Sequence, residues 1–266
     1  MQRGLIALTT DFGDADGFVG VMKGVIAGIA PEAHVIDLCH GVSRGDIRHG
    51  AFVLLCAVGH FPDGTIHVGV VDPGVGTDRR AICVCAGSQV LIGPDNGLLS
   101  WAARRLGGAR TYHVTRSDLF ADEVSSTFHG RDVFAPVAAH LAMGVRPDQL
   151  GPEVTDVVEL PFPEVETSAS GDIVGEVIHV DRFGNLITNI QGERLAARNR
   201  VSLTVRAGGQ VIRGLSETYG SKAVGELGAL IGSSGYLEVA VNGGSAGVTT
   251  GLAVGDRVRI SGGEDR

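Results

Sequence analysis

Residues 5–29, LIALTTDFGDADGFVGVMKGVIAGI, join a short apolar stretch, a polar junction and an amphipathic segment. The apolar stretch, Leu5–Leu8, predicts a buried strand. Residues 17–29 predict a helix, because apolar side chains recur there at helical spacing. The polar junction at 9–16 therefore lies at the carboxyl end of a strand, which is where open α/β sheets bind their ligands.

The alternation of strand and helix patterns continues to about residue 144. Strand patterns occur at 34–38, 66–71, 81–86 and 90–92, and helical patterns occur at 46–58, 97–106 and 134–144. Pro136 falls in the first turn of the last helix, where proline is tolerated. Strands separated by helices indicate a mostly parallel sheet covered on both faces. We therefore predict an α/β N-terminal domain with a mostly parallel sheet over residues 1–163.

The pattern changes after a Pro- and Ser-rich stretch at 161–171, PFPEVETSASG, and we predict a linker at 164–171. Short strand patterns follow at 173–180, 186–190, 200–205, 210–214, 229–231, 236–241 and 256–260. Turns separate these patterns at regular intervals, which is typical of small barrels and sandwiches. A smaller all-β, barrel-like C-terminal domain is predicted over residues 172–266.

The composition excludes several classes of protein. With 44% hydrophobic and 20% charged residues among 266, the chain is predicted to be a soluble globular protein. A net charge of -8 argues against a nucleic-acid partner, whose phosphates would be repelled. No segment approaches the roughly 18 apolar residues of a membrane helix, and the apolar start is too short for a signal peptide. We expect no membrane partner and a cytoplasmic location.

Metal-ligand spacing is absent from the sequence. The four cysteines (Cys39, Cys56, Cys83 and Cys85) do not form the paired pattern of a zinc site. Cys83 and Cys85 fall two residues apart in a predicted strand and are expected to be small buried hydrophobic residues. The histidines between His34 and His67 are scattered without ligand spacing. We predict no metal site.

The polar junction carries three carboxylates within six residues, and the last of them, Asp16, directly precedes the predicted helix. A carboxylate can accept hydrogen bonds from both hydroxyls of a sugar diol. It can also bind a metal or cap the following helix. These alternatives remain open at the level of the residues alone.

Two further polar runs follow strand-like sequence in the first domain. Residues 71–80, VDPGVGTDRR, place glycines between Asp72 and Arg79, which either belong to a binding site or form a structural salt bridge. No Lys-Ser/Thr pair follows these glycines, so the run is not a phosphate-binding P-loop. Residues 126–136, STFHGRDVFAP, contain His129 beside a candidate ion pair, Arg131 and Asp132.

The second domain has two polar runs near strand ends, at 180–189 and 231–244. They contain short polar residues: Asp181, Asn185, Ser233 and Ser234. A role in turns explains any one of them, but it explains the combination less well.

These polar runs, in this order, resemble the S-adenosyl-L-methionine (SAM) hydroxide adenosyltransferases, which are relatives of the fluorinating and chlorinating SAM enzymes. The resemblance covers nearly the whole chain, from TTDFG at 9–13 to NGGSA at 242–246. It implies an α/β domain joined to a barrel-like domain. It also implies a homotrimer in which SAM lies between one subunit's first domain and its neighbour's second. SAM would be the substrate, with no cofactor and no metal.

The resemblance implies a role for each candidate site residue. The catalytic set corresponds to Asp72, Arg79 and His129. In substrate binding, Asp16 would accept hydrogen bonds from the ribose hydroxyls. The methionine amino and carboxylate groups would be held by Asp181, Ser233 and Ser234. The adenine edge would be bound by Asn185 and by the backbone of Val241 and Gly243. The spacing from Asp181 to Phe183 is one residue shorter than in the halogenating relatives.

The activity so implied is attack of water or hydroxide on C5′ of SAM, which gives adenosine and L-methionine. The sulfonium makes methionine a neutral leaving group, so the protein's task is to position and stabilise the nucleophile. Asp72 would hold Arg79 or His129, or accept the proton. A SAM-dependent halogenase and a non-catalytic SAM- or adenosine-binding protein are the alternatives. The halogenating relatives have an aromatic residue in place of Asp72 and an inserted loop that this chain lacks, which favours water.

Overall fold

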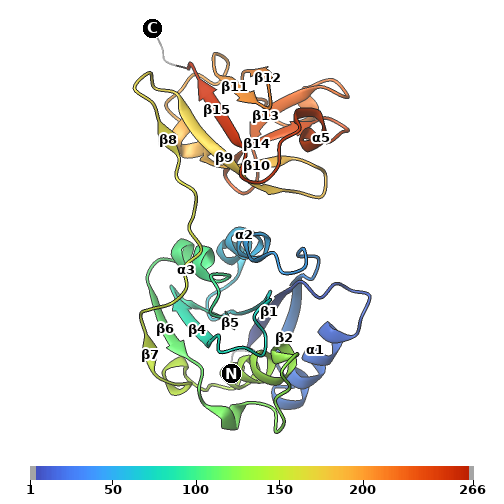
Figure 1. Cartoon of the computed structure of the whole chain (residues 1–266), viewed down its shortest axis with the longest axis vertical. Coiled ribbons are helices and arrows are strands. Elements are labelled where there is room, and N and C mark those ends of the chain that lie inside the picture. The colour runs from blue at the N-terminus through green and yellow to red at the C-terminus, as the bar shows by residue number, and fades with distance from the viewer. Residues whose placement is uncertain (1–3, 264–266) are drawn as a thin grey trace. The chain divides into compact units, whose positions relative to one another are not determined.

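A computed structural model describes residues 4–263 of the chain. The chain divides into two compact units, one ending at Pro161 and one beginning at Phe162 (Figure 1). The segment predicted as a linker contains a short strand, β8 (Glu166–Thr167), which pairs with the first long strand of the second unit.

The first unit contains a seven-stranded sheet with the strand order β2-β1-β3-β5-β4-β6-β7. Its strands are β1 (Leu5–Thr10), β2 (His34–Cys39), β3 (Ile66–Val70), β4 (Ala81–Ala86), β5 (Gln89–Pro94), β6 (Ala109–His113) and β7 (Glu153–Val154). Its helices are α1 (Phe18–Ile29), α2 (Ile47–Ala57), α3 (Ser100–Leu106) and α4 (Ala135–Ala142). Shorter helical turns occupy Val58–His60, Ser117–Leu119, Gly130–Phe134 and Pro147–Gln149. The four predicted helices are confirmed within a few residues.

The prediction of a mostly parallel sheet is wrong. Strands β1, β2, β3 and β5 pair in parallel, but β4 runs antiparallel to both β5 and β6, and β7 is antiparallel to β6. The cause is the two-residue connection Gly87-Ser88, which joins β4 to β5 as a hairpin and leaves no room for a crossover helix. Gly87 has a φ of 55°, a conformation that glycine adopts without strain. The sheet is therefore mixed.

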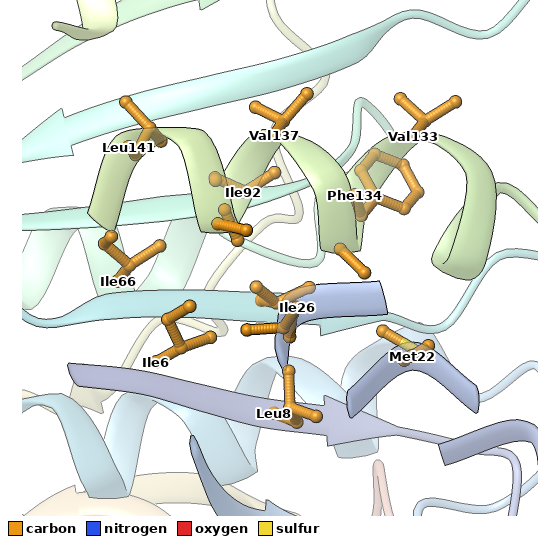
Figure 2. Close-up of a cluster of buried hydrophobic side chains, with 14 of the residues drawn as sticks. Ile6, Leu8, Met22, Ile26, Ile66, Ile92, Val133, Phe134, Val137 and Leu141 are labelled. Atoms are coloured by element: carbon orange, nitrogen blue, oxygen red, sulfur yellow. The ribbon is translucent and has the colours of Figure 1, made fainter. Parts of the chain in front are cut away.

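Helices cover both faces of this sheet. On one face α1 and α4 pack on β1, β3 and β5 through a cluster that includes Ile6, Leu8, Met22, Ile26 and Phe134 (Figure 2). On the other face α2 and α3 pack against a second cluster with Leu54, Leu91, Leu98 and Ala102. The polar loops at the carboxyl ends of β1 and β3 are left outside these cores. These loops carry predicted site residues: Asp16 follows β1, and Asp72 and Arg79 follow β3.

The second unit is a nearly closed antiparallel barrel, as predicted. Its strands follow the order β12-β11-β15-β9-β10-β14-β13, and the two end strands contact each other. The strands are β9 (Ile173–Val180), β10 (Leu186–Gln191), β11 (Thr204–Ala207), β12 (Gln210–Arg213), β13 (Leu227–Ile231), β14 (Tyr236–Val241) and β15 (Arg257–Ser261). Short turns at Gly192–Leu195 and Tyr219–Ser221 and the helix α5 (Ala246–Thr250) connect them. One apolar cluster, including Val177, Leu186 and Leu237, fills the interior.

Candidate active site

Asp72 and Arg79 face each other across the loop between β3 and β4. Nε of Arg79 donates to Oδ1 and Oδ2 of Asp72 at 3.0 and 2.9 Å, and Nη2 also donates to Oδ2. The side chain of Arg79 is only 11% exposed and that of Asp72 only 5%. The guanidinium also lies over the ring of Phe134, 5.3 Å from its centre. Buried bidentate pairs of this kind hold a guanidinium in one orientation.

His129 completes this cluster. Nη2 of Arg79 lies 2.7 Å from Nδ1 of His129. The three residues predicted as the catalytic set are therefore brought together, although 50 positions separate Arg79 from His129. Asp72 and Arg79 do form a salt bridge, which was one of the two alternatives for this pair. Arg79 also contacts His129, and a purely structural salt bridge does not require this contact.

A close backbone approach joins the two loops that carry these residues. Gly76 has a φ of 77°, and a Cβ at this position would lie 2.2 Å from the carbonyl oxygen of Ser126. Only glycine fits such a contact. The glycines in the run at 71–80 therefore allow the two loops to contact each other, in addition to forming the turn.

A π-turn, Gly130–Phe134, follows His129 and leads into α4. Pro136 has no N–H, so the carbonyl of Asp132 receives no helical hydrogen bond from it and instead accepts one from the backbone N–H of Ala121 at 2.9 Å. The carboxylate of Asp132 pairs with Arg131 at 2.5 Å and accepts a hydrogen bond from the backbone N–H of Ser125. The predicted ion pair therefore orients the loop. Such π-turns are often found at functional sites.

The surroundings of His129 favour its neutral form. Burial, and next the charge of Arg79, lower the pKa of His129 below its usual 6.5, against the opposing effect of Asp72 and Asp132. A guanidinium can only donate hydrogen bonds, so Nδ1 must be the acceptor and the ring proton must lie on Nε2. His129 therefore offers an N–H donor at Nε2.

A cavity of about 620 Å³ adjoins this cluster in the first unit. Its lining includes Asp72, His129, Asp16 and Arg44, together with three aromatic side chains, Phe12, Phe18 and Phe128. The rings of the three lie 5.2–5.8 Å apart, centre to centre. The volume is within the range of small-molecule sites.

Asp16 is exposed at the edge of this cavity. The N-cap position of α1 is Gly17, and no side chain caps this helix. The alternative that Asp16 caps the helix is therefore excluded. Its neighbour Asp11 has a structural role, because Oδ2 of Asp11 accepts the backbone N–H of Gly45 at 2.7 Å. Asp16 remains available to a ligand in the cavity.

A second cavity, of about 770 Å³, lies in the barrel unit. It is lined by the predicted residues Asp181, Asn185, Ser233, Val241 and Gly243, and also by Phe183, Tyr219, Glu238, Asn242, Gly244 and Ser245. Ser234 is not in this lining. Its hydroxyl oxygen is buried and has no hydrogen-bond partner among the described residues.

The turn at 181–185 is built on the carboxylate of Asp181. Oδ1 accepts the backbone N–H groups of Phe183 and Asn185, both at 2.9 Å, and Oδ2 accepts the side-chain amide of Asn185 at 2.9 Å. The turn leaves the amide oxygen of Asn185 and one amide hydrogen to a ligand. Gly243, with a φ of 72°, makes the facing turn after Val241.

Six residues that line the second cavity were not predicted as site residues, and three of them, Phe183, Tyr219 and Glu238, have large side chains. Phe183 is 76% exposed, an unusual position for an aromatic ring. Tyr219 lies in a turn, and Glu238 lies in β14, where the sequence shows only an apolar strand pattern. A charged residue inside such a pattern was the signal that could have revealed Glu238.

The described residues 4–263 contain no group of three or more His, Cys, Asp or Glu side chains that could hold a metal ion. In the same range no helix is long and apolar enough to cross a membrane. Cys83 is buried, as expected, but Cys39, Cys56 and Cys85 are only half-buried, and none of the four cysteines forms a disulfide.

Comparison with known proteins decides the family. The model for the SAM hydroxide adenosyltransferase N-terminal domain matches residues 6–151, and the model for the C-terminal domain of the same family matches residues 175–259. The chain belongs to the SAM hydroxide adenosyltransferase family. The chain therefore contains both domains of the family, in the order that the resemblance implied.

Relatives with curated names cover nearly the whole chain. The (R)-S-adenosyl-L-methionine hydrolase of Salinispora tropica is 47% identical over 261 residues, which cover 97% of this chain and 98% of the relative. The protein of the same name from Thermus thermophilus is 41% identical, covering 94% and 97%. The fluorinase of Nocardia brasiliensis is more distant, at 27% identity over 97% of both chains.

A solved structure supports the fold of this chain. The crystal structure of an uncharacterised conserved protein from Thermotoga maritima has a TM-score of 0.90 and 36% sequence identity, and it covers 96% of this chain and 99% of that chain.

Proposed function

We propose that this protein hydrolyses S-adenosyl-L-methionine, with the R configuration at sulfur, to adenosine and L-methionine. The relatives at 41–47% identity are named for this substrate. Because "L" already fixes the α-carbon of methionine, the descriptor "R" refers to the sulfonium centre. The observation that carries the proposal is the contact of Arg79 with both Asp72 and His129 beside a cavity.

In the proposed reaction the oxygen of a water molecule attacks C5′ of the ribose. A proton of the water passes to the solvent before attack, so the attacking oxygen is that of hydroxide. The C5′–S bond then breaks and its electron pair stays on sulfur. Methionine leaves as a neutral thioether and needs no acid. In-line attack therefore depends on how the nucleophile is held and how its negative charge is stabilised.

His129 and Arg79 are assigned to the nucleophile. The Nε2–H of His129 donates to the attacking oxygen, and the guanidinium of Arg79 stabilises its negative charge. Asp72 holds Arg79 in place, because Arg79 occupies both of its oxygens. This favours anchoring over proton acceptance among the two roles open to Asp72.

The substrate's other parts are assigned to the two cavities. Asp16 accepts the ribose hydroxyls in the first unit. Asn185 and the backbone of Val241 and Gly243 bind the adenine edge in the second unit, where the exposed ring of Phe183 offers a stacking surface. Asp181, Ser233 and Ser234 are assigned to the methionine end.

Complete sites then form between subunits of a homotrimer. Light scattering of the purified protein tests this oligomeric state. We also propose a cytoplasmic location and no need for a cofactor.

The decisive experiment uses each sulfonium epimer separately in ¹⁸O-labelled water. The expected result is adenosine labelled at the 5′-hydroxyl, formed faster from the R epimer. Added fluoride or chloride should give no 5′-halo-5′-deoxyadenosine. Halogenated product would support the halogenase alternative, and tight binding without turnover would support a non-catalytic binding protein.

A further inference from the structure

Glu238 is a buried carboxylate in the middle of a barrel strand. It is 5% exposed, and its neighbours Leu237 and Val239 belong to the apolar interior of the barrel. Because side chains alternate along a strand, Glu238 lies on the opposite face, where it lines the cavity of the second unit. Gly232 leaves space for it, since a Cβ on Gly232 would lie 1.7 Å from Oε1 of Glu238.

Glu238 has only a neutral partner in the described structure. The hydroxyl of Tyr219 donates to Oε2 of Glu238 at 2.7 Å. No lysine, arginine or histidine among residues 4–263 forms an ion pair with it. Burial raises the pKa of Glu238 above its usual value, and burial together with Glu238 raises the pKa of Tyr219 to about 12. A buried carboxylate in this state is costly unless a cation pairs with it.

The cavity itself has a deficit of positive charge. Its lining contains two carboxylates, Asp181 and Glu238, and no basic side chain. Three hydrogen bonds within its own turn already engage Asp181. Glu238 accepts one hydrogen bond, and a carboxylate has about four acceptor positions. Of the two, Glu238 has the greater capacity to bind a further donor.

We propose that Glu238 binds the ammonium group of the substrate's methionine moiety. This inference rests on the proposed function and deepens it, because within the methionine end it assigns the ammonium group to Glu238 rather than to Asp181, whose oxygens its own turn engages. The substrate has two cationic centres, and only the ammonium has N–H groups that hydrogen-bond to a carboxylate. Adenosine has neither centre and should not depend on Glu238.

The test uses the reaction products, so it needs no turnover. With adenosine present at saturation, calorimetry measures the Kd of L-methionine and that of 4-(methylthio)butanoic acid, which is methionine with hydrogen in place of the amino group. For the unmodified protein we expect L-methionine to bind about 30-fold more tightly or better. In Glu238→Gln this preference should fall to about twofold or less, while the Kd of adenosine stays within about twofold.

Glu193→Gln is the matched control, because Glu193 is exposed and lies outside the cavity. It should keep the full preference for L-methionine. If Glu238→Gln fails to fold, Glu238→Asp keeps the charge but withdraws it by one methylene, and a partial loss of preference is expected. An unmodified protein without the preference, or a Glu238→Gln variant that retains it, would overturn the inference. So would equal weakening of adenosine binding by Glu238→Gln.

The two proposals fail in different ways. If SAM yields no adenosine but the preference for L-methionine depends on Glu238, the proposed hydrolysis is wrong and the role of Glu238 stands. If SAM is hydrolysed and the preference does not depend on Glu238, only the role of Glu238 is wrong.

Discussion

Nη2 of Arg79 lies 2.7 Å from Nδ1 of His129, and the guanidinium has no acceptor to offer in return. Protonating Nδ1 would place two donors against each other and break this contact. The protonation state of His129 therefore decides whether the contact between Arg79 and His129 can form.

The first prediction concerns pH. Because burial and Arg79 lower the pKa of His129, kcat/KM for SAM should be constant near neutral pH and fall only on the acid side of 6.5. Below pH 6.5 the unfolded chain binds this proton more readily than the folded chain, so His129 also lowers the free energy of unfolding as pH falls. A pH profile of kcat/KM checks the prediction. An acid limb centred above 6.5 would contradict it.

The second prediction concerns Arg79. The substitution Arg79→Lys keeps the positive charge but removes the planar guanidinium fork that contacts Asp72 and His129 together. We expect kcat to fall by about 10²- to 10³-fold, with the Kd of adenosine nearly unchanged. The control is Arg116→Lys, since Arg116 pairs with Asp118 at an exposed position. Equal losses of activity in both variants would contradict a role of Arg79 at the nucleophile.

The third prediction separates backbone strain from a loop contact. Gly64 and Gly76 have similar φ angles of 79° and 77°, but a Cβ on Gly64 would meet no atom within 4 Å. Gly64→Ala should lower the free energy of unfolding by roughly 1–2 kcal/mol from strain alone. Gly76→Ala should lower it further and also reduce kcat, because the added methyl group pushes the two loops apart. Denaturant unfolding and steady-state kinetics of both variants provide the measurement.

The fourth prediction concerns the ribose. Asp16→Asn should weaken adenosine binding by about 10- to 100-fold through loss of charged hydrogen bonds. Stability should not change, since Asp16 does not cap α1. Asp14→Asn, in the same loop but outside the cavity lining, is the control. With 2′,3′-dideoxyadenosine, Asp16→Asn and the unmodified protein should bind alike. If Asp16→Asn weakened binding of this analogue as much as it weakens binding of adenosine, Asp16 would not be a ligand of the ribose hydroxyls.

The sequence predicted the elements of the fold better than the direction of the strands. Periodicity located α1 to α4 and every long strand of the barrel, because each buries a continuous apolar face. It could not give the orientation of β4, which depends on a two-residue turn. Strand β6 escaped prediction because Arg110, Thr111 and His113 break its apolar pattern.

The same limit applies to the candidate site. Asp72, Arg79 and His129 stand out because charged residues adjoin glycines, and the structure places them in contact. Glu238 did not stand out, because its strand reads as apolar, and its significance depends on Tyr219 from a distant turn. Pairing between remote side chains is a property of the tertiary structure.

The reversal of β4 also bears on the order of folding. Strands β4 and β5 pair through a local hairpin, whereas β1 and β3 are joined across about 60 residues (Ile6 with Ile66). Local pairs form sooner than distant ones, because closing a shorter loop loses less entropy. The loop carrying Asp72 and Arg79 links β3 to this hairpin, and His129 reaches it from farther along the chain. During refolding, recovery of hydrolysis should therefore lag behind recovery of the far-ultraviolet circular dichroism signal.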